Sequence, residues 1–245
     1  MSKKYLKNQI IDCACVIHGD YYDFKYVEIL ERSLKRHLSC EFRFHVWTES
    51  HRTIPNHMIK HNLADLGVAG PKSAWWHKTQ LFNTNDFSGK LYYFDLDTII
   101  VGNLDWLQML PDNIFWAVRD FRYLWRPHKT LINSSVMIFN NSNLSHIWEK
   151  FLNNKHTIIK KYHGDQDYIH AELSQINVNN QFLDIKKVKS YRWEVLHGGI
   201  DFVTRQYPKK TSVSVEWAAD TSIIIFHGEP KPHQIYETKL INHWF

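Results

Sequence analysis

The chain of 245 residues is 44% hydrophobic and 15% aromatic, which is enough apolar material for a sizeable core. Its formal net charge is +5, but the lysines and arginines are spread along the chain and form no basic block. A nucleic-acid-binding surface usually gathers such residues on one helix or stripe, so we expect no nucleic-acid partner. The positive excess suits a ligand that carries a diphosphate, or an anionic membrane surface.

Three cysteines, Cys13, Cys15 and Cys40, lack the spacing of a metal site, and we expect buried, reduced thiols in a cytoplasmic protein. Residues 1–9 are polar and basic and do not resemble a secretion signal. The sequence holds no apolar run long enough to cross a membrane. Trp244 and Phe245 are candidates for peripheral membrane contact, although packing against the protein itself is the favoured interpretation.

Apolar periodicity predicts strands and helices that alternate along the chain. Residues 10–17 (IIDCACVI) form an apolar run typical of a buried strand. A helix is expected over residues 24–38, because apolar side chains recur there at intervals of three and four. Further segments with the pattern of strands are 42–48, 91–94, 114–118, 136–139 and 223–226, and those with the pattern of helices are 73–82, 144–152 and 166–173.

Strands that alternate with helices predict an α/β fold with a mostly parallel central sheet flanked by helices. In such sheets ligands bind beyond the carboxyl ends of the strands. The polar clusters that directly follow predicted strands are His18-Gly19-Asp20, Asp95-Leu96-Asp97, Arg119-Asp120 and His227-Gly228. If these strands run parallel, the four clusters meet at one edge of the sheet.

Asp95 and Asp97 stand two residues apart at the end of a predicted strand, so both carboxylates can face one cation. Mg²⁺ and Mn²⁺ prefer oxygen ligands, and two carboxylates leave positions open for phosphate oxygens. The spacing alone is weak evidence, since about one such pair is expected by chance in a chain of this length. A second pair does occur, at Asp165 and Asp167. Capping of a turn is the alternative role for a strand-end Asp.

The segment IIIFHGEPKP places His227 after another apolar strand. Its imidazole offers a nitrogen ligand that Mn²⁺ tolerates. Gly228 lets the backbone approach a ligand, and the two prolines stiffen the loop that carries Lys231. A rigid cation beside a metal suits a leaving diphosphate, whereas a half-buried, hydrogen-bonded histidine is the alternative explanation.

Six segments of the chain share motifs with one group of enzymes. The central one is FSGKLYYFDLDTIIVGNLDWL. The others, in chain order, are KYVEILERSLKRHL with FRFHVWTE, AWWHKTQLF, NSSVMIFN, HGDQDYIHAEL and FHGEPKP. Together they resemble the GT-A-fold glycosyltransferases, nearest to family 8 and its relatives. Two features depart from family 8: the terminal loop is two residues shorter, and Asn133-Ser134-Ser135 stands in place of Asn-Ala-Gly.

The resemblance implies a glycosyltransferase that moves a hexose from a UDP-sugar, depends on Mn²⁺ or Mg²⁺, and retains the anomeric configuration. It implies a single GT-A domain over residues 1–245, with a nucleotide-binding half over about 1–100 and an acceptor-side half over about 101–245. The implied metal ligands are Asp95, Asp97 and His227. The implied donor-contacting residues are Tyr21 (or Tyr22) on the base, Lys78, Asn133, Gly228 and Lys231. The implied residues near the transferred sugar are Asp120, Asp165 and Gln166, which with Lys231 form the catalytic set.

Several alternatives stay open at this point. A sugar nucleotidyltransferase needs a Gly-rich loop after the first strand, where only Gly19 stands. A zinc hydrolase is suggested by His57 and His61, four residues apart, but no third ligand is evident. An inverting enzyme and a non-catalytic nucleotide-sugar-binding module are the remaining rivals. The acceptor, whether a glycan, a lipid-linked sugar or a protein, is not readable from the residues.

Overall fold

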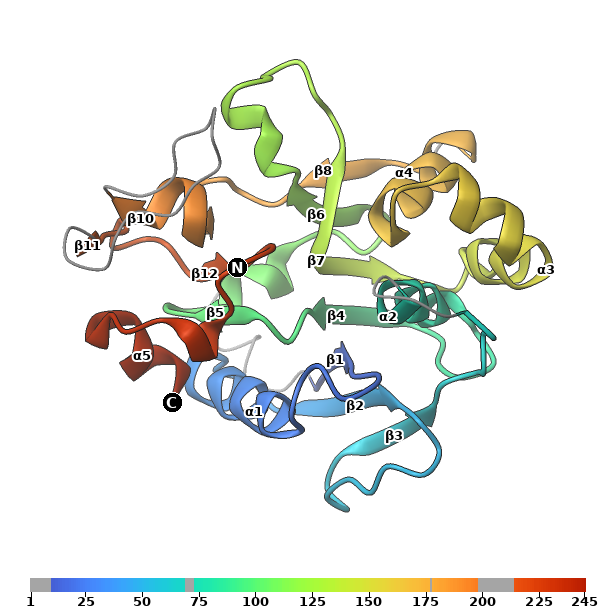
Figure 1. The fold of residues 1–245 in the computed structure, drawn as a ribbon, viewed down its shortest axis with the longest axis horizontal. Helices are drawn as coiled ribbons and strands as arrows, with labels where there is room; N and C mark the ends of the chain where they lie inside the picture. The colour runs from blue at the N-terminus through green and yellow to red at the C-terminus, as the bar shows by residue number, and fades with distance from the viewer. Residues whose placement is uncertain (1–9, 69–72, 177, 198–213) are drawn as a thin grey trace.

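The computed structural model describes residues 10–68, 73–176, 178–197 and 214–245. Its centre is a seven-stranded sheet in the order β3-β2-β1-β4-β7-β6-β8 (Figure 1). All neighbouring strands of this sheet are parallel except β7, which runs antiparallel to β4 and to β6. The strands are β1 Ile11–Val16, β2 Phe42–Thr48, β3 Ile59–Asn62, β4 Lys90–Phe94, β6 Phe115–Arg119, β7 Ile132–Asn140 and β8 Asn180–Phe182. The predicted mostly parallel α/β sheet is therefore confirmed.

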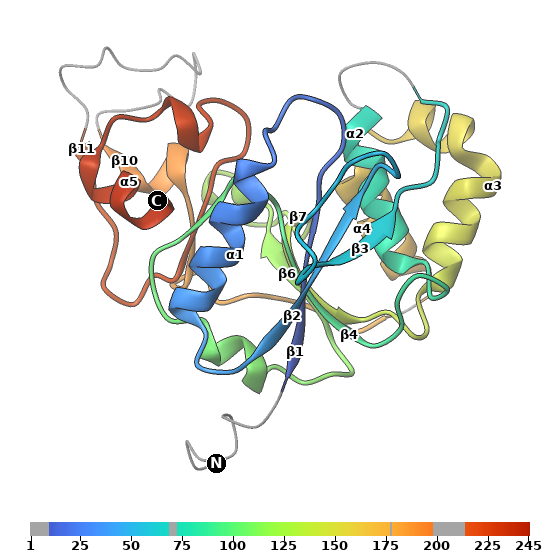
Figure 2. The ribbon, with the colours of Figure 1, turned by 90° about the horizontal axis from the view of Figure 1, so that it is seen from below.

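Helices cover both faces of this sheet (Figure 2). The helix α1 (Lys25–His37) lies on one side, while α2 (Ser73–Trp76), α3 (Ser145–Lys161) and α4 (Asp165–Gln175) lie on the other. The alternation of side chains along β1 serves the two layers separately. Cys13 and Cys15 belong to the apolar cluster on the α1 side, and Ala14 belongs to the cluster on the other side. All three cysteines are buried and free, as predicted.

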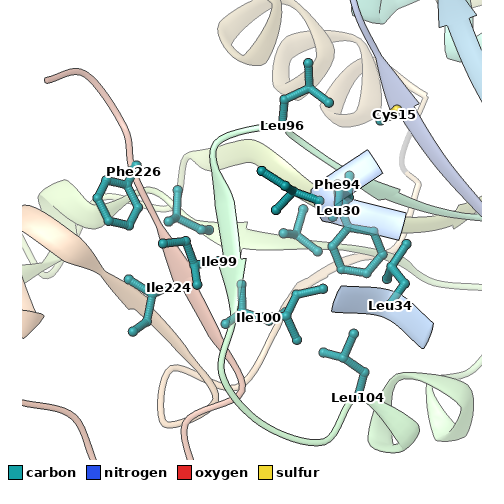
Figure 3. Packing of buried hydrophobic residues seen from close by; sticks show 14 of the residues in the cluster. Cys15, Leu30, Leu34, Phe94, Leu96, Ile99, Ile100, Leu104, Ile224 and Phe226 are labelled. Atoms are coloured by element: carbon teal, nitrogen blue, oxygen red, sulfur yellow. The ribbon is translucent and has the colours of Figure 1, made fainter. Parts of the chain in front are cut away.

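A second, three-stranded sheet forms beside the first, in the order β5-β12-β9. Its strands are β5 Thr98–Ile100, β9 Val188–Ser190 and β12 Ile223–Ile225. β12 pairs antiparallel with β5 and parallel with β9. In Figure 3, Ile99, Ile100 and Ile224 of this sheet pack in one cluster with Leu30 and Leu34 of α1.

This second sheet corrects one expectation. β1, β4 and β6 run in the same direction in the main sheet, so the polar residues that follow these strands lie at the same edge of the sheet, as expected. The strand that carries His227 is not in that sheet. β12 pairs instead with β5, because β5 continues the chain directly after Asp97 and offers three buried residues to pair with.

The observed element boundaries differ most from the predicted ones where buried polar residues interrupt an apolar pattern. The strand predicted over 136–139 begins at Ile132, because Asn133, Ser134 and Ser135 are buried within β7. The helix predicted over 73–82 is α2 followed by a 3₁₀ segment, His77–Phe82. Short elements that were not predicted are the strands β3, β5, β8 and β9, together with β10 Leu196–His197, β11 Ser214–Val215, α5 Thr238–Trp244 and the turns Asp105–Met109, Phe121–Leu124, Tyr191–Val195 and Pro232–Gln234.

The C-terminal helix α5 packs against α1. Trp244 is 5% exposed and its ring meets that of Tyr26 edge to face, with centroids 5.1 Å apart. Packing against the protein, the favoured interpretation of Trp244, is therefore confirmed, whereas Phe245 is half exposed. Within the described residues, no helix is both long enough and apolar enough to cross a membrane.

Candidate active site

Polar side chains gather where β1, β4 and β6 end. Asp95 and Asp97 follow β4, Asp120 follows β6, and Asn133 lies at the beginning of the antiparallel β7 between them. The backbone amide of Asp95 donates to the carbonyl oxygen of Ser135 at 2.7 Å, which fixes the acid pair against β7. Residues that are distant in the sequence therefore share one edge of the sheet.

Asp97 is a buried carboxylate with two hydrogen-bonding partners. The ammonium group of Lys231 lies 2.5 Å from Oδ2, and the hydroxyl of Tyr22 donates to the same oxygen at 2.9 Å. Burial raises the pKa of Asp97; the Lys231 charge opposes this shift and the nearby Asp95 adds to it. Two carboxylates that repel each other in a buried place favour a cation between them.

Asp95 belongs to a second buried cluster, which Lys78 holds together. The Lys78 ammonium lies 2.9 Å from Asp95 Oδ1 and 3.3 Å from Asp165 Oδ2, and it donates to Ser134 Oγ at 3.0 Å. Ser134 Oγ in turn donates to Asp165 Oδ2 at 2.8 Å, and the Tyr93 hydroxyl bonds to Asp95. Burial lowers the pKa of Lys78, but the charges of Asp165 and Asp95 outweigh burial and raise it overall, so Lys78 is a cation.

A third cluster is centred on Asp120. Arg122 binds its carboxylate with two parallel hydrogen bonds of 2.8 Å, and the side-chain amide of Gln166 donates to Oδ2 at 3.1 Å. Burial alone would raise the pKa of Asp120, but the bonds from Arg122 and Gln166 outweigh it and lower the pKa. Because the Gln166 nitrogen is held by Asp120, its carbonyl oxygen is the end of the amide that is left to meet a ligand.

His227 lines the same cavity as Asp120, and the amide of the preceding Phe226 donates to the carbonyl oxygen of Asp97 at 3.1 Å. The ring of His227 stacks on Phe121 at 4.9 Å, and its Nε2 lies 2.7 Å from Ser190 Oγ. Burial lowers the pKa of His227 to about 3, and the charge of Arg192 acts in the same direction, so the imidazole is neutral. Gly228 follows with φ +76°, a conformation that favours glycine.

The chemistry of these residues fits a divalent ion in part. Asp95 and Asp97 supply the hard oxygen ligands that Mn²⁺ and Mg²⁺ prefer, and the neutral His227 can supply nitrogen. Across the ranges that the structure describes, however, no three His, Cys, Asp or Glu side chains are close enough together to hold one ion. The three-ligand set of Asp95, Asp97 and His227 therefore stays a prediction.

Two cavities lie at the edge of the sheet where β1, β4 and β6 end, one near the ends of β1–β3 and one near the end of β6 and the start of β7. One of about 330 Å³, the β1–β3 cavity, lies at the ends of the first three strands; its lining includes His18, Glu49, Leu63, Asp65, Leu66 and His77. The other of about 390 Å³, the β6–β7 cavity, has a lining that includes Asp120, Arg122, Asn133, Gln166, Trp193 and His227. Neither lining includes Asp95 or Asp97, whose strand β4 lies between β1 and β7 in the sheet.

The tyrosines after β1 lie beside the acid pair. Tyr21 is 62% exposed and its hydroxyl donates to Glu229 at 2.8 Å, while Tyr22 is bonded to Asp97. Neither is among the residues that line the β1–β3 cavity. The rings that meet there are those of His18 and His77, stacked with centroids 3.9 Å apart. Stacking of Tyr21 on a base stays a prediction.

Several site residues escaped the sequence analysis. Arg122 had a signal that could have been used, because an Arg two residues after a strand-end Asp can turn back on it. Ser134 was noticed only as a departure from the family pattern, although its hydroxyl joins Lys78 to Asp165. Ser190, Arg192 and Trp193 belong to an aromatic stretch that the sequence offers as a possible acceptor loop. Nothing in that stretch indicates its contact with His227, which depends on the pairing of β9 with β12.

The structure also bears on the zinc-hydrolase alternative. His57 and His61 do not share a helical face, because His61 lies in the strand β3. His57 pairs with Glu31, whereas His61 stacks on Trp47 at 4.0 Å and bonds to His45. The two imidazoles thus have separate structural roles.

No protein-family model and no curated protein matches the sequence. Solved structures do. LgtC, described as a galactosyltransferase in complex with donor and acceptor sugar analogs, superposes with a TM-score of 0.60 at 15% identity, over 90% of this chain and 88% of its own. An active-site Gln-to-Glu variant of LgtC superposes with a TM-score of 0.62 at 14% identity, over 90% of this chain and 89% of its own.

The glycosyltransferase GlyE of Streptococcus pneumoniae TIGR4 superposes with a TM-score of 0.59 at 18% identity, over 94% of this chain. This chain has the GT-A glycosyltransferase fold. The predicted fold class is thereby confirmed. The match spans 59% of the GlyE chain, so it says nothing about the rest of that protein.

Proposed function

We propose that this chain is a glycosyltransferase that moves a hexose from a UDP-sugar to an acceptor. The observation that carries the proposal is that Asp95 and Asp97 follow β4, which lies in the sheet between the strands whose ends carry the two cavities. We assign the base and ribose to the β1–β3 cavity, the diphosphate to the acid pair and Lys231, and the hexose with the acceptor to the β6–β7 cavity. The LgtC structure with donor and acceptor sugar analogs supports this class of ligands.

Asp95, Asp97 and His227 are the proposed holders of Mn²⁺ or Mg²⁺. When bound, such an ion neutralises the charge that develops on a leaving diphosphate. Lys231 is then the natural partner for a diphosphate oxygen, because its stem is buried and its ammonium already lies at this point. Lys78 holds Asp95 and Asp165 in place, because its ammonium group pairs with both carboxylates.

The state of the carboxylates supports retention over inversion. An inverting enzyme needs a carboxylate that accepts the acceptor's proton, and a lowered pKa makes Asp120 a weak base. In the retaining reaction, the bond from the anomeric carbon to the diphosphate oxygen breaks and the bond to the acceptor oxygen forms on the same face. The departing diphosphate oxygen takes the acceptor's proton. The Gln166 carbonyl dipole stabilises the positive carbon between these two events.

Binding and turnover test the proposal separately. UDP with Mn²⁺ should raise the melting temperature more than GDP or CMP does, because a ligand of the native state stabilises it. Incubation with UDP-glucose, UDP-galactose and UDP-N-acetylglucosamine should release UDP, and chelator should abolish the release. Binding without any release would indicate a non-catalytic nucleotide-sugar-binding module, and full activity in chelator would remove the metal from the proposal.

A matched pair of variants locates the site. Asp97→Asn should lower turnover by more than about 100-fold, since even changes next to metal ligands cost 10- to 100-fold. Asp112→Asn removes an exposed carboxylate that pairs with Lys90 on the surface, and it should leave turnover unchanged. NMR of the product's anomeric proton decides the stereochemistry: an α-linked donor that gives a β-linked product would show inversion and direct attention to Asp167 in the same cavity.

A further inference from the structure

The turn after β6 is closed by an ion pair between Asp120 and Arg122. The guanidinium of Arg122 donates from Nε to Oδ1 of Asp120 and from Nη2 to Oδ2, both at 2.8 Å. The backbone amide of Arg122 also donates to Oδ1, at 2.9 Å. The Asp120 side chain is only 9% exposed, so its carboxylate is held in one orientation with little competition from water. The ion pair therefore forms a rigid part of the β6–β7 cavity, whose lining includes both residues.

The carboxylate of Asp120 is already fully hydrogen-bonded. A carboxylate offers about four acceptor positions, two on each oxygen. Arg122 occupies three of these positions with its backbone and side-chain donors. The side-chain amide of Gln166 occupies the fourth, through its bond to Oδ2 at 3.1 Å. A sugar hydroxyl could bind to Asp120 only by displacing Arg122 or Gln166, so the carboxylate serves its neighbours in the protein rather than the ligand.

The same bonds decide which end of the Gln166 amide meets the sugar. A side-chain amide donates through its nitrogen and accepts through its oxygen, and a flip exchanges the two ends. An ionised carboxylate only accepts, so Asp120 binds the nitrogen end. Burial alone would raise the pKa of Asp120, but the bonds from Arg122 outweigh burial, lower the pKa and keep the carboxylate ionised. The carbonyl oxygen of Gln166 is thereby left to face the β6–β7 cavity.

We propose that Arg122 is a positioning residue for the transfer step, which orients the amide of Gln166 through the carboxylate of Asp120. The inference rests on the proposed function, in which the Gln166 carbonyl stabilises the positive anomeric carbon. Arg122 takes no part in making or breaking bonds. The nucleotide is assigned to the β1–β3 cavity and the acid pair, and not to this turn. A change at Arg122 should therefore lower turnover and spare nucleotide affinity.

Rates of UDP release from UDP-sugars and UDP affinity from isothermal titration calorimetry, both with Mn²⁺, test the assignment. Arg122→Gln removes the fork and should lower turnover at saturating donor by about 10- to 100-fold, because small misplacements at a reaction centre cost that much. UDP affinity should stay within about twofold of wild type. Arg122→Lys keeps the charge without the two parallel bonds, so its turnover should fall between wild type and Arg122→Gln.

The Gln166→Ala background shows whether Arg122 acts through Gln166. Once the amide is absent, Arg122 has nothing left to orient, so adding Arg122→Gln should lower turnover further by less than about twofold. A further loss as large as in the wild-type background would overturn the inference, because Arg122 would then act on the ligand directly. Unchanged turnover in Arg122→Gln alone, or a parallel loss of UDP affinity, would also overturn it.

Arg43 supplies the matched control. It binds Asp12 with the same fork, from Nε to Oδ1 at 2.6 Å and from Nη2 to Oδ2 at 2.7 Å. Asp12 lies near the start of β1, whereas the site lies beyond the ends of the strands. Arg43→Gln should therefore leave turnover and UDP affinity unchanged. An equal loss of turnover in Arg43→Gln and Arg122→Gln would overturn the role of Arg122, because any broken fork would then have this effect.

Two further results separate this inference from its foundation. If Arg122→Gln does not fold, Arg122→Lys and Arg122→Met give the same comparison with and without Gln166. A wild-type protein that binds no UDP and releases none from any UDP-sugar would instead overturn the proposed function.

Discussion

The β1–β3 cavity and the β6–β7 cavity are similar in size but differ in construction. The β1–β3 cavity is lined by one stretch of the chain, from His18 to His77, and its characteristic feature is a pair of stacked imidazoles. The β6–β7 cavity collects residues from the turn after β6, from β7, from α4 and the loop before it, from the turn after β9 and from the loop after β12. Asp120 and Arg122 are ion-paired there.

The difference indicates different tasks. Stacked aromatic rings accept a flat base with little demand on its exact orientation. A reacting sugar needs polar groups held at fixed positions, because small misplacements at a reaction centre cost much of the rate. In the β6–β7 cavity, the Asp120–Arg122 ion pair and the hydrogen bond from Gln166 to Asp120 hold polar groups at fixed positions.

A change in the β6–β7 cavity should therefore affect turnover and spare affinity. Gln166→Ala removes the carbonyl dipole at the reacting carbon and should lower the rate of UDP-sugar turnover by about 10- to 1000-fold. The affinity for UDP, measured by calorimetry, should be nearly unchanged because the nucleotide does not reach this cavity. Equal losses in turnover and UDP affinity would contradict the division between the cavities.

A change in the β1–β3 cavity should do the opposite. His18→Ala removes one ring of the stacked pair and should weaken UDP binding by about 2- to 10-fold, the value of one aromatic contact. Turnover at saturating donor should be unaltered. His18→Phe restores a planar ring and should recover most of the affinity, whereas equally weak binding of both variants would argue against stacking.

The smallest expected effect is a loss of folding stability at acidic pH, caused by two buried histidines on the β1–β3 side of the sheet. Burial lowers the pKa of His77 and of His61 to about 4 in the folded chain, below the value near 6.5 that an unfolded histidine has. Between about pH 6.5 and 4 the unfolded chain therefore takes up protons that the folded chain does not, and stability falls as the pH falls.

Urea unfolding at pH 7, 6 and 5 measures this loss. His61→Gln removes one titrating group outside both cavities, so its free energy of unfolding should depend less steeply on pH than that of the wild type. The exposed His128 serves as control, and His128→Gln should leave the slope unchanged. An identical slope for His61→Gln and wild type would show that His61 is not held neutral.

The sequence predicted β1, β2, β4 and β6 of the main sheet, because their buried residues form apolar runs or alternate with polar ones. It did not predict the short edge strands β3 and β8. It also placed Asp95 and Asp97 correctly at a strand end, since a polar residue directly after an apolar run marks that point. β7 was only half recognised, because its first residues are polar and are buried through hydrogen bonds, such as that from Ser134 to Asp165. Periodicity carries no information about such bonds.

The position of His227 was the least accessible to sequence reasoning. Its strand was recognised, but a three-residue apolar run does not say which partner it pairs with, and β12 pairs with β5 and β9 rather than with the main sheet. The stacking of His227 on Phe121 and its bond to Ser190 follow from that pairing. Arg192 enters the site for the same reason.

The pairing of β5 with β12 also has a consequence for biosynthesis. Ile99 lies directly after the acid pair, yet its partner Ile224 is translated only after nearly all other elements of the fold. When β4 and β5 have left the ribosome but β12 has not, the nascent chain therefore carries an unpaired apolar strand next to Asp97. Contacts between such distant parts form late and slow the folding of a domain. The acid pair and the His227 loop are joined in the last stage of synthesis. A truncated chain that lacks β12 therefore leaves β5 as an unpaired strand that is open to aggregation.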